Sequence, residues 1–218
     1  MALPKLLSPE FSVELPSTKQ PVKFRPFLVK EEKVLFMAME SGEPRDIQKS
    51  VMNVLRSCIL TPDVEVDKLT AYDVEYLFLQ LRSKSVGEQV EVNLSHQDPK
   101  IKELCTHEQK VSINLEDIKV TFNENHTDVV NISKDIGVKM RAPSLDIVLS
   151  NSGNKEVSIE NSMNILAKCI VHVFDKDNVY EEFTVTEMKE FIESLTQEQF
   201  KNIQKFFETM PKLTHTVK

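Results

Sequence analysis

The residues best able to do chemistry in this sequence are a cysteine and a histidine that stand close together, Cys105 and His107. His96 lies upstream of this pair and His126 lies downstream. Thiolate and imidazole are ligands that zinc prefers, but zinc sites usually combine two ligand pairs, each about two to four residues apart. Only one close pair is present here. A zinc-binding module or small metalloenzyme centred on Cys105 and His107 is therefore kept as the alternative function, and no metal ligand is assigned.

Other catalytic patterns are incomplete. Asp175-Lys-Asp-Asn resembles the opening of a calcium loop, but the glycine and the final glutamate of such a loop are missing. No Gly-x-Ser-x-Gly turn and no Gly-x-x-x-x-Gly-Lys phosphate loop occurs. Neighbouring carboxylates such as Glu31 and Glu32 are typical of solvated helix starts, and none stands in the apolar setting that a general acid requires. We therefore expect no catalytic residue, no cofactor and no enzyme activity.

Composition and charge exclude further classes. The 218 residues carry 27 basic and 34 acidic side chains, a net charge of −7, and no basic run that would attract nucleic acid. The longest apolar runs are too short to span a bilayer, and the N-terminus lacks the pattern of a signal peptide. Three widely spaced cysteines fit a reducing compartment. We expect a cytoplasmic protein without a nucleic-acid or membrane partner.

The first part of the chain predicts a short hairpin followed by helices. Alternating apolar residues in 11–27 surround a Pro-Ser-Thr turn, which favours two short strands. A helix is expected over Val29–Glu40, and Pro44 suits the first turn of the next helix. That second helix has the clearest apolar stripe in the sequence: Ile47, Val51, Val54, Leu55, Cys58 and Ile59.

A third helix, capped by Thr70 and running to about Lys84, has two apolar faces. One face carries Val74, Leu77, Phe78 and Leu81, and the opposite face carries Tyr72, Tyr76 and Leu79. A helix of this kind must be covered on both sides. Either it is a central core helix, or its tyrosine-bearing face meets a partner, because tyrosine is enriched at protein interfaces.

From Gly87 to about Arg141 the apolar period changes to alternation, which predicts four or five strands. Helices are then expected over Asn161–Phe174 and Thr186–Ser194. The last helix starts with the capping box Thr196–Gln199 and has a stripe of apolar residues, namely Phe200, Ile203, Phe207 and Met210. Phe206 lies off this stripe, so it is either exposed or buried by another part of the protein.

These elements predict an α+β fold. We expect a helical body with an N-terminal β-hairpin and an inserted small antiparallel β-sheet subdomain. The divisions are 1–86 for the hairpin and first helices, 87–142 for the β subdomain, and 143–218 for a C-terminal helical region that packs with the N-terminal helices.

Four stretches of the chain resemble the baseplate hub assembly proteins of T4-like bacteriophages. They are FRPFLVKEEKVLFMAMESG, AYDVEYLFLQLRSKSVGE, VSINLEDIKV and ESLTQEQFKNIQKFFETMPKL, spread from about residue 20 to residue 213. The stretches keep the order of the family. The resemblance implies a protein that helps to build the central hub of a contractile tail baseplate, with other hub proteins as partners and with no catalytic activity or cofactor.

The expected function is thus a non-enzymatic protein-interaction role in baseplate hub assembly. The protein is either a structural subunit of the virion tail or an assembly factor, a chaperone that acts in the cytoplasm of the infected host and then leaves. Self-association remains open. The candidate partner contacts are Tyr72, Tyr76, Leu79, Phe206 and the N-terminal segment Pro4–Phe11.

Overall fold

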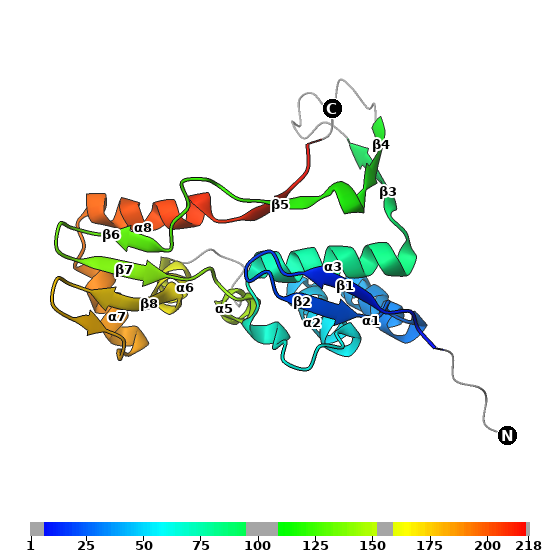
Figure 1. Ribbon diagram of the computed structural model, residues 1–218, viewed down its shortest axis with the longest axis horizontal. Helices are drawn as coiled ribbons and strands as arrows, with labels where there is room; N and C mark the ends of the chain where they lie inside the picture. Colours follow the sequence, from blue (N-terminus) through cyan, green and yellow to red (C-terminus); the bar gives the residue numbers. More distant parts are fainter. Residues whose placement is uncertain (1–6, 95–108, 152–158, 217–218) are drawn as a thin grey trace.

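The computed structural model describes residues 7–94, 109–151 and 159–216 (Figure 1). His96, Cys105 and His107 lie outside these ranges, as does the start of the segment Pro4–Phe11. Within the described ranges, no group of three or more histidine, cysteine or acidic residues is placed to hold a metal ion. The alternative zinc-binding module on Cys105 and His107 thus falls outside the described residues.

The N-terminal part folds as the sequence pattern predicts. Its elements are β1 (Phe11–Glu14), β2 (Pro21–Phe24), α1 (Val29–Ser41), α2 (Pro44–Cys58), the short 3-10 helix η1 (Val66–Lys68) and α3 (Ala71–Val86). Pro44 begins α2, and Thr70 caps α3 by accepting a hydrogen bond from the backbone of Asp73. Gly42 ends α1 with a φ of 67°, a backbone conformation that glycine adopts without a steric penalty.

A buried carboxylate joins the hairpin to α3. Asp73 is fully buried and accepts hydrogen bonds from the backbone N–H of Ser17 at 3.0 Å, from the Ser17 hydroxyl, and from the Thr70 hydroxyl at 2.6 Å. The turn between β1 and β2 is thereby held on the first turn of α3. The core beneath it combines residues of the hairpin, α2, η1 and α3, among them Leu15, Val22, Leu55 and Leu77.

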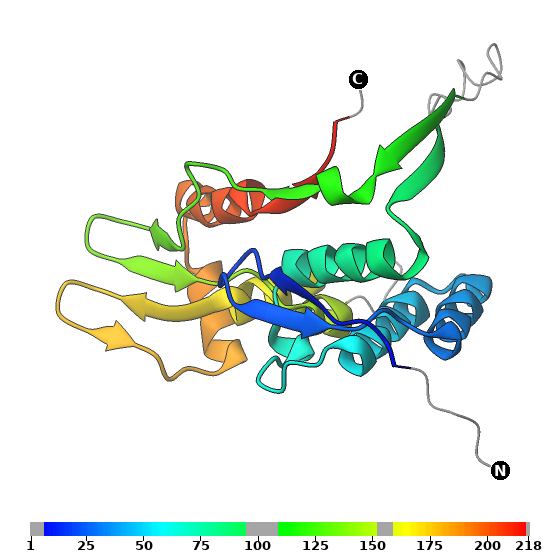
Figure 2. The same ribbon diagram turned by 45° about the vertical axis from the view of Figure 1, so that its right-hand side comes forward.

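The strands of residues 87–142, expected to form one inserted subdomain, contribute to three separate sheets. Strands β3 (Gln89–Leu94) and β4 (Gln109–Asn114) pair with each other in a ribbon that projects from the body (Figure 2). A 3-10 helix, η2 (Leu115–Asp117), leads to β5 (Lys119–Thr121), which pairs with the C-terminal strand β10 (Lys212–Thr214). Strands β6 (Val129–Asn131) and β7 (Gly137–Met140) join β8 and β9 in a four-stranded sheet.

One helix prediction is wrong in its second part. The expected helix Asn161–Phe174 is α6 (Ile159–Cys169) followed directly by strand β8 (Ile170–Phe174), which pairs with β7. The sequence Ile-Val-His-Val-Phe of β8 is rich in β-branched and aromatic side chains, which pack well on a pleated surface. Pairing with β7 therefore outweighs continuation of the helical pattern.

The C-terminal part has a core of its own. Helices α6, α7 (Val185–Glu193) and α8 (Gln197–Thr209) pack against the antiparallel sheet β6-β7-β8-β9, whose last strand is Val179–Tyr180. Buried residues from the strands meet buried residues from the helices, including Val138, Met140, Leu166, Met188, Ile192, Ile203 and Phe206.

Two connections join the two cores, which lie side by side along the long axis of the molecule (Figure 1). Helix α5 (Leu145–Asn151) contacts both η1 and α6. Strands β5 and β10 contact α3, so Lys212–Thr214 pair with β5 beside this helix. The described contacts between the two cores thus include α5 with η1 and β10 with α3.

We expect Asp73→Ala to destabilise the protein by about 2 to 3 kcal/mol, because it removes a fully buried carboxylate and the hydrogen bonds that this carboxylate accepts from Ser17 and Thr70. Urea unfolding followed by circular dichroism measures this change. Asp63→Ala, at an exposed carboxylate, serves as the control and is expected to change the free energy of unfolding by less than about 0.5 kcal/mol. Equal effects of the two substitutions would contradict the role given to Asp73.

Candidate interaction surfaces

The two faces of α3 differ in how completely they are covered. Val74, Leu77 and Leu81 are buried in the N-terminal core, as expected for the first face. On the second face, Tyr72, Tyr76 and Leu79 are half-buried. The structure thus brings these three candidate residues together on one surface, without enclosing them.

The chain itself supplies part of the cover for this second face. Strands β5 and β10 contact α3, and a hollow of about 200 Å³ remains between Tyr72, Glu75 and the tail residues near Pro211. Burial raises the pKa values of Tyr72, Tyr76 and Glu75 above their ordinary ranges. The second face of α3 is therefore partly buried by the tail and partly exposed to solvent.

Phe206 lies inside the protein, with 3% of its surface exposed. Its ring packs against the rings of His126 and Phe207, with centroid distances of 4.9 and 5.3 Å. His126 also forms a hydrogen bond of 3.0 Å with the Thr209 hydroxyl. The segment around His126 therefore buries Phe206, which is one of the two alternatives left by its position off the α8 stripe. Phe206 stabilises α8 and is not at the surface in this structure.

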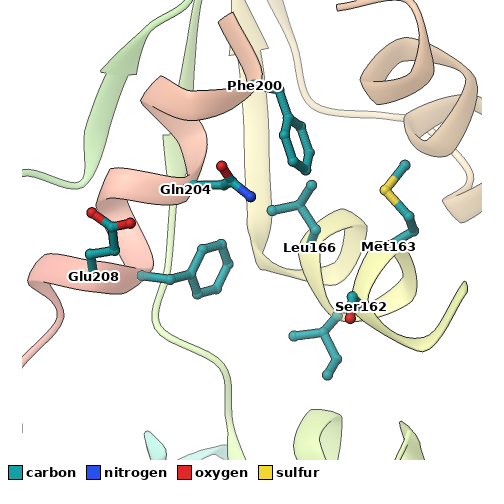
Figure 3. Close-up of a pocket in the computed structure, with 8 residues that line it drawn as sticks. Ser162, Met163, Leu166, Phe200, Gln204 and Glu208 are labelled. Carbon is teal, nitrogen blue, oxygen red and sulfur yellow. The ribbon is translucent and has the colours of Figure 1, made fainter. Parts of the chain in front are cut away.

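A hollow lies between α6 and α8 (Figure 3). Its volume is about 640 Å³. Phe200 and Gln204 point from α8 toward Leu166 on α6, and Glu208 follows one turn further along α8. The residues that line this α6–α8 groove are Ser162, Met163, Ile165, Leu166, Phe200, Gln204, Phe207 and Glu208.

The α6–α8 groove has apolar walls and one acidic side chain. Phe200 and Phe207 belong to the stripe predicted from the sequence, but they are only half-buried, whereas Ile203 on the same stripe is fully buried. Glu208 is the one charged residue among the lining residues. A groove of this kind suits an apolar peptide segment or helix face that carries a lysine or arginine at the matching end.

The outward side of α1 is a second apolar surface, and sequence reasoning missed it. Four α1 residues expose much of their side chains: Val29 at 80%, Phe36 at 57%, Met37 at 60% and Met39 at 63%. Apolar residues occur all around this helix, a pattern that normally indicates a buried helix. The sequence therefore indicates only that α1 lacks a polar face. It does not indicate which side of the helix remains exposed to solvent.

A smaller hollow of about 340 Å³ adjoins this surface, between α1, α2 and α3. Phe36 and Met39 line it from α1, Val51 from α2, and Phe78 and Val86 from α3. The exposed apolar side chains of α1 and this hollow form one continuous surface, which we call the α1 surface. Exposed apolar patches of this kind mark interaction sites on soluble proteins.

A buried ion pair holds the start of α1. Glu31 accepts hydrogen bonds from the backbone N–H of Leu28 at 2.8 Å and from Arg25 at 3.0 Å. The Arg25 guanidinium also donates to the Ser57 carbonyl at the end of α2. Burial alone would raise the pKa of Glu31, but the bonds from Arg25 and Leu28 outweigh it and hold this pKa below its ordinary value.

The two described thiols are structural. Cys58 and Cys169 are fully buried in the N-terminal and C-terminal cores. Burial raises the pKa of Cys58 to about 11 and that of Cys169 to about 12. Because the thiolate is the reactive form, neither group is poised to act as a nucleophile or a metal ligand.

One comparison with known proteins assigns the chain to a family. The sequence pattern described as "T4 bacteriophage base plate protein" matches residues 8–218. The chain belongs to this family. The match covers both cores, the α6–α8 groove and the α1 surface of this baseplate protein. No curated protein and no solved structure matches the chain. Among the described residues, no helix is both long enough and apolar enough to cross a bilayer.

We expect Glu31→Gln to weaken the acid sensitivity of this baseplate protein. A carboxylate whose pKa is lowered by folding stabilises the native state fully above its ordinary pKa, and this contribution is lost as the pH falls through the folded pKa. Between about pH 6 and pH 3, the wild type should therefore lose more free energy of unfolding than Glu31→Gln. Urea unfolding across this range measures the difference, and parallel pH profiles would contradict it.

We also expect Cys58 and Cys169 to be unreactive in the native state. In a Cys105→Ser background, Ellman's reagent at about pH 8 should detect almost no thiol within minutes, since thiolate is the attacking species. Both thiols should react after unfolding in guanidinium chloride. Rapid labelling of the folded variant would show that one of the cores opens.

Proposed function

We propose that this chain is a non-enzymatic interaction subunit of the baseplate hub, and that it binds another hub protein through the α6–α8 groove. The observation that carries this proposal is the groove itself: an apolar hollow of about 640 Å³ in a protein of the baseplate family. Membership of the family gives the setting, which is contact with other baseplate proteins in the tail. The groove supplies a surface of suitable size and chemistry.

Charge and burial favour a peptide-like occupant from a partner protein. The groove is walled by Met163, Leu166, Phe200 and Phe207, so an apolar segment gains free energy by leaving water there. Glu208 at one end favours a partner segment with a basic residue at the matching position. The net charge of −7 keeps the free subunit soluble while this apolar surface is open.

The open part of the α3 face is the second contact that we propose. Tyr72, Tyr76 and Leu79 form a half-buried surface, and tyrosine offers both apolar area and a hydroxyl to a partner. A hub protein that packs against β5 and β10 would complete the cover of this face.

We further propose that the chain stays in the finished tail as a structural subunit. Comparison of purified particles with the lysate of infected cells, by mass spectrometry and immunoblot, tests this point. A fixed copy number in particles is the expected result. Abundance in the lysate together with absence from particles would overturn it and identify an assembly chaperone that leaves the hub.

We expect Gln204→Trp to block the α6–α8 groove, because the indole would fill the space between the helices. The matched control is Lys201→Trp, which places the same bulk at an exposed position of α8 that does not line the groove. In cells infected with a phage that lacks the wild-type gene, Gln204→Trp should strongly reduce incorporation into particles and the yield of infectious phage. Lys201→Trp should support both. Equal complementation by the two variants would refute the groove assignment.

We expect Tyr76→Ala combined with Leu79→Ala to reduce partner binding while the protein stays folded. Binding is measured by co-purification with hub proteins expressed together with the variant, and folding is measured by thermal unfolding. A cooperative transition at a temperature close to that of the wild type is the expected control result. Loss of the folded state would instead show that this face of α3 belongs to the core.

A further inference from the structure

We propose that α1 pairs with α1 of a second copy of this chain, in antiparallel orientation, to form a two-fold symmetric dimer. This inference goes beyond the proposed function, because it uses the α1 surface and not the α6–α8 groove. It rests on the exposed apolar residues of α1 and on the order of the charges among them.

The outward face of α1 is a continuous stripe. Val29, Lys33, Phe36 and Glu40 are spaced at i, i+4, i+7 and i+11, so they lie on one side of the helix, and the exposed Met37 flanks them. The opposite side, which includes Glu31 and Ala38, is buried. Figure 2 shows α1 at the outer edge of the molecule, next to α2. A second helix can therefore approach this stripe.

The two charges on the stripe itself have opposite signs at opposite ends. Lys33 lies in the first half of the helix and Glu40 near its end, while Glu32 lies beside the stripe, where it lines the adjoining hollow. Lys33 and Glu40 are separated by about 10 Å along the helix axis, which is too far for a direct ion pair. Among the described residues, no ion pair involves Lys33, Glu40 or Glu43. These groups are free to pair with another chain.

An antiparallel second copy satisfies both the charges and the apolar residues. If the two-fold axis passes between Phe36 and Met37, Phe36 of each copy faces Met37 of the other copy. Lys33 then faces Glu40 of the second copy, and the same contact recurs on the other side of the axis, as in every isologous interface. A parallel pair would instead bring like charges together, which costs free energy.

The hollow beside α1 adds to this interface. Phe36 belongs to the stripe and also lines the hollow of about 340 Å³ between α1, α2 and α3, which the exposed Met39 lines as well. Apolar side chains of the second copy thus meet an extended apolar surface and not a single helix ridge. The charged residues at both ends set the direction of the pairing.

The test is the mass of the full chain in solution, measured by sedimentation equilibrium. We expect the wild type to form a species of twice 25.0 kDa in the micromolar range. Lys33→Glu and Glu40→Lys should each raise the dimer dissociation constant by about tenfold or more, because each creates two like-charge contacts. An equimolar mixture of these two variants should recover the dimer, since every contact in the mixed dimer joins an acidic side chain to a basic one.

Two controls make the result decisive. Lys201→Glu reverses an exposed charge on α8 and should leave the dimer unchanged, and so should Gln204→Trp in the α6–α8 groove. Failure of the groove proposal is therefore distinguishable from failure of this one. A wild type that remains monomeric at about 100 μM, well above the micromolar range of common transient complexes, would overturn the proposal and leave the α1 surface to a different protein. A mixture of Lys33→Glu and Glu40→Lys that does not regain the dimer would also overturn it.

Discussion

The architecture depends on the need to cover both apolar faces of α3. One face buries Val74, Leu77 and Leu81 against the hairpin and α2, and Asp73 fixes the start of the helix to the hairpin turn. The other face is met by β5 and β10, which brings the end of the chain back onto its first third. This single helix therefore couples the N-terminal core to the tail that follows α8.

The second face of α3 is only partly buried, and two other apolar surfaces of the protein also remain partly exposed to solvent. The α6–α8 groove leaves Phe200 and Phe207 half-buried, and α1 exposes Phe36, Met37 and Met39. A monomer that only had to be stable would gain by closing these surfaces, because apolar area in contact with water is unfavourable. Their persistence in a member of the baseplate family fits a protein whose contacts are completed by its neighbours in the tail.

Much of the fold could be predicted from local patterns. Sequence patterns predict the hairpin, α1, α2, α3, α7 and α8 at nearly their observed positions, because caps, proline placement and apolar period act within one element. Prediction failed at β8, where a strand follows α6 without a turn and its pairing with β7 decides the structure. The exposure of α1 and the burial of Phe206 by the His126 segment cannot be predicted from local sequence patterns either. Both depend on residues that are distant in the sequence.

The sequence by itself determined the class of the protein: an acidic α+β chain without a catalytic pattern and with the stretches of a phage baseplate family. Only the tertiary structure decided which apolar residues remain open to partners. The physical reason is that an apolar period shows that a face must be covered, but it carries no information about what covers it. For Tyr72 part of the cover is the tail of the same chain, and for Phe206 it is a loop. Phe36 remains more than half exposed to solvent among the described residues.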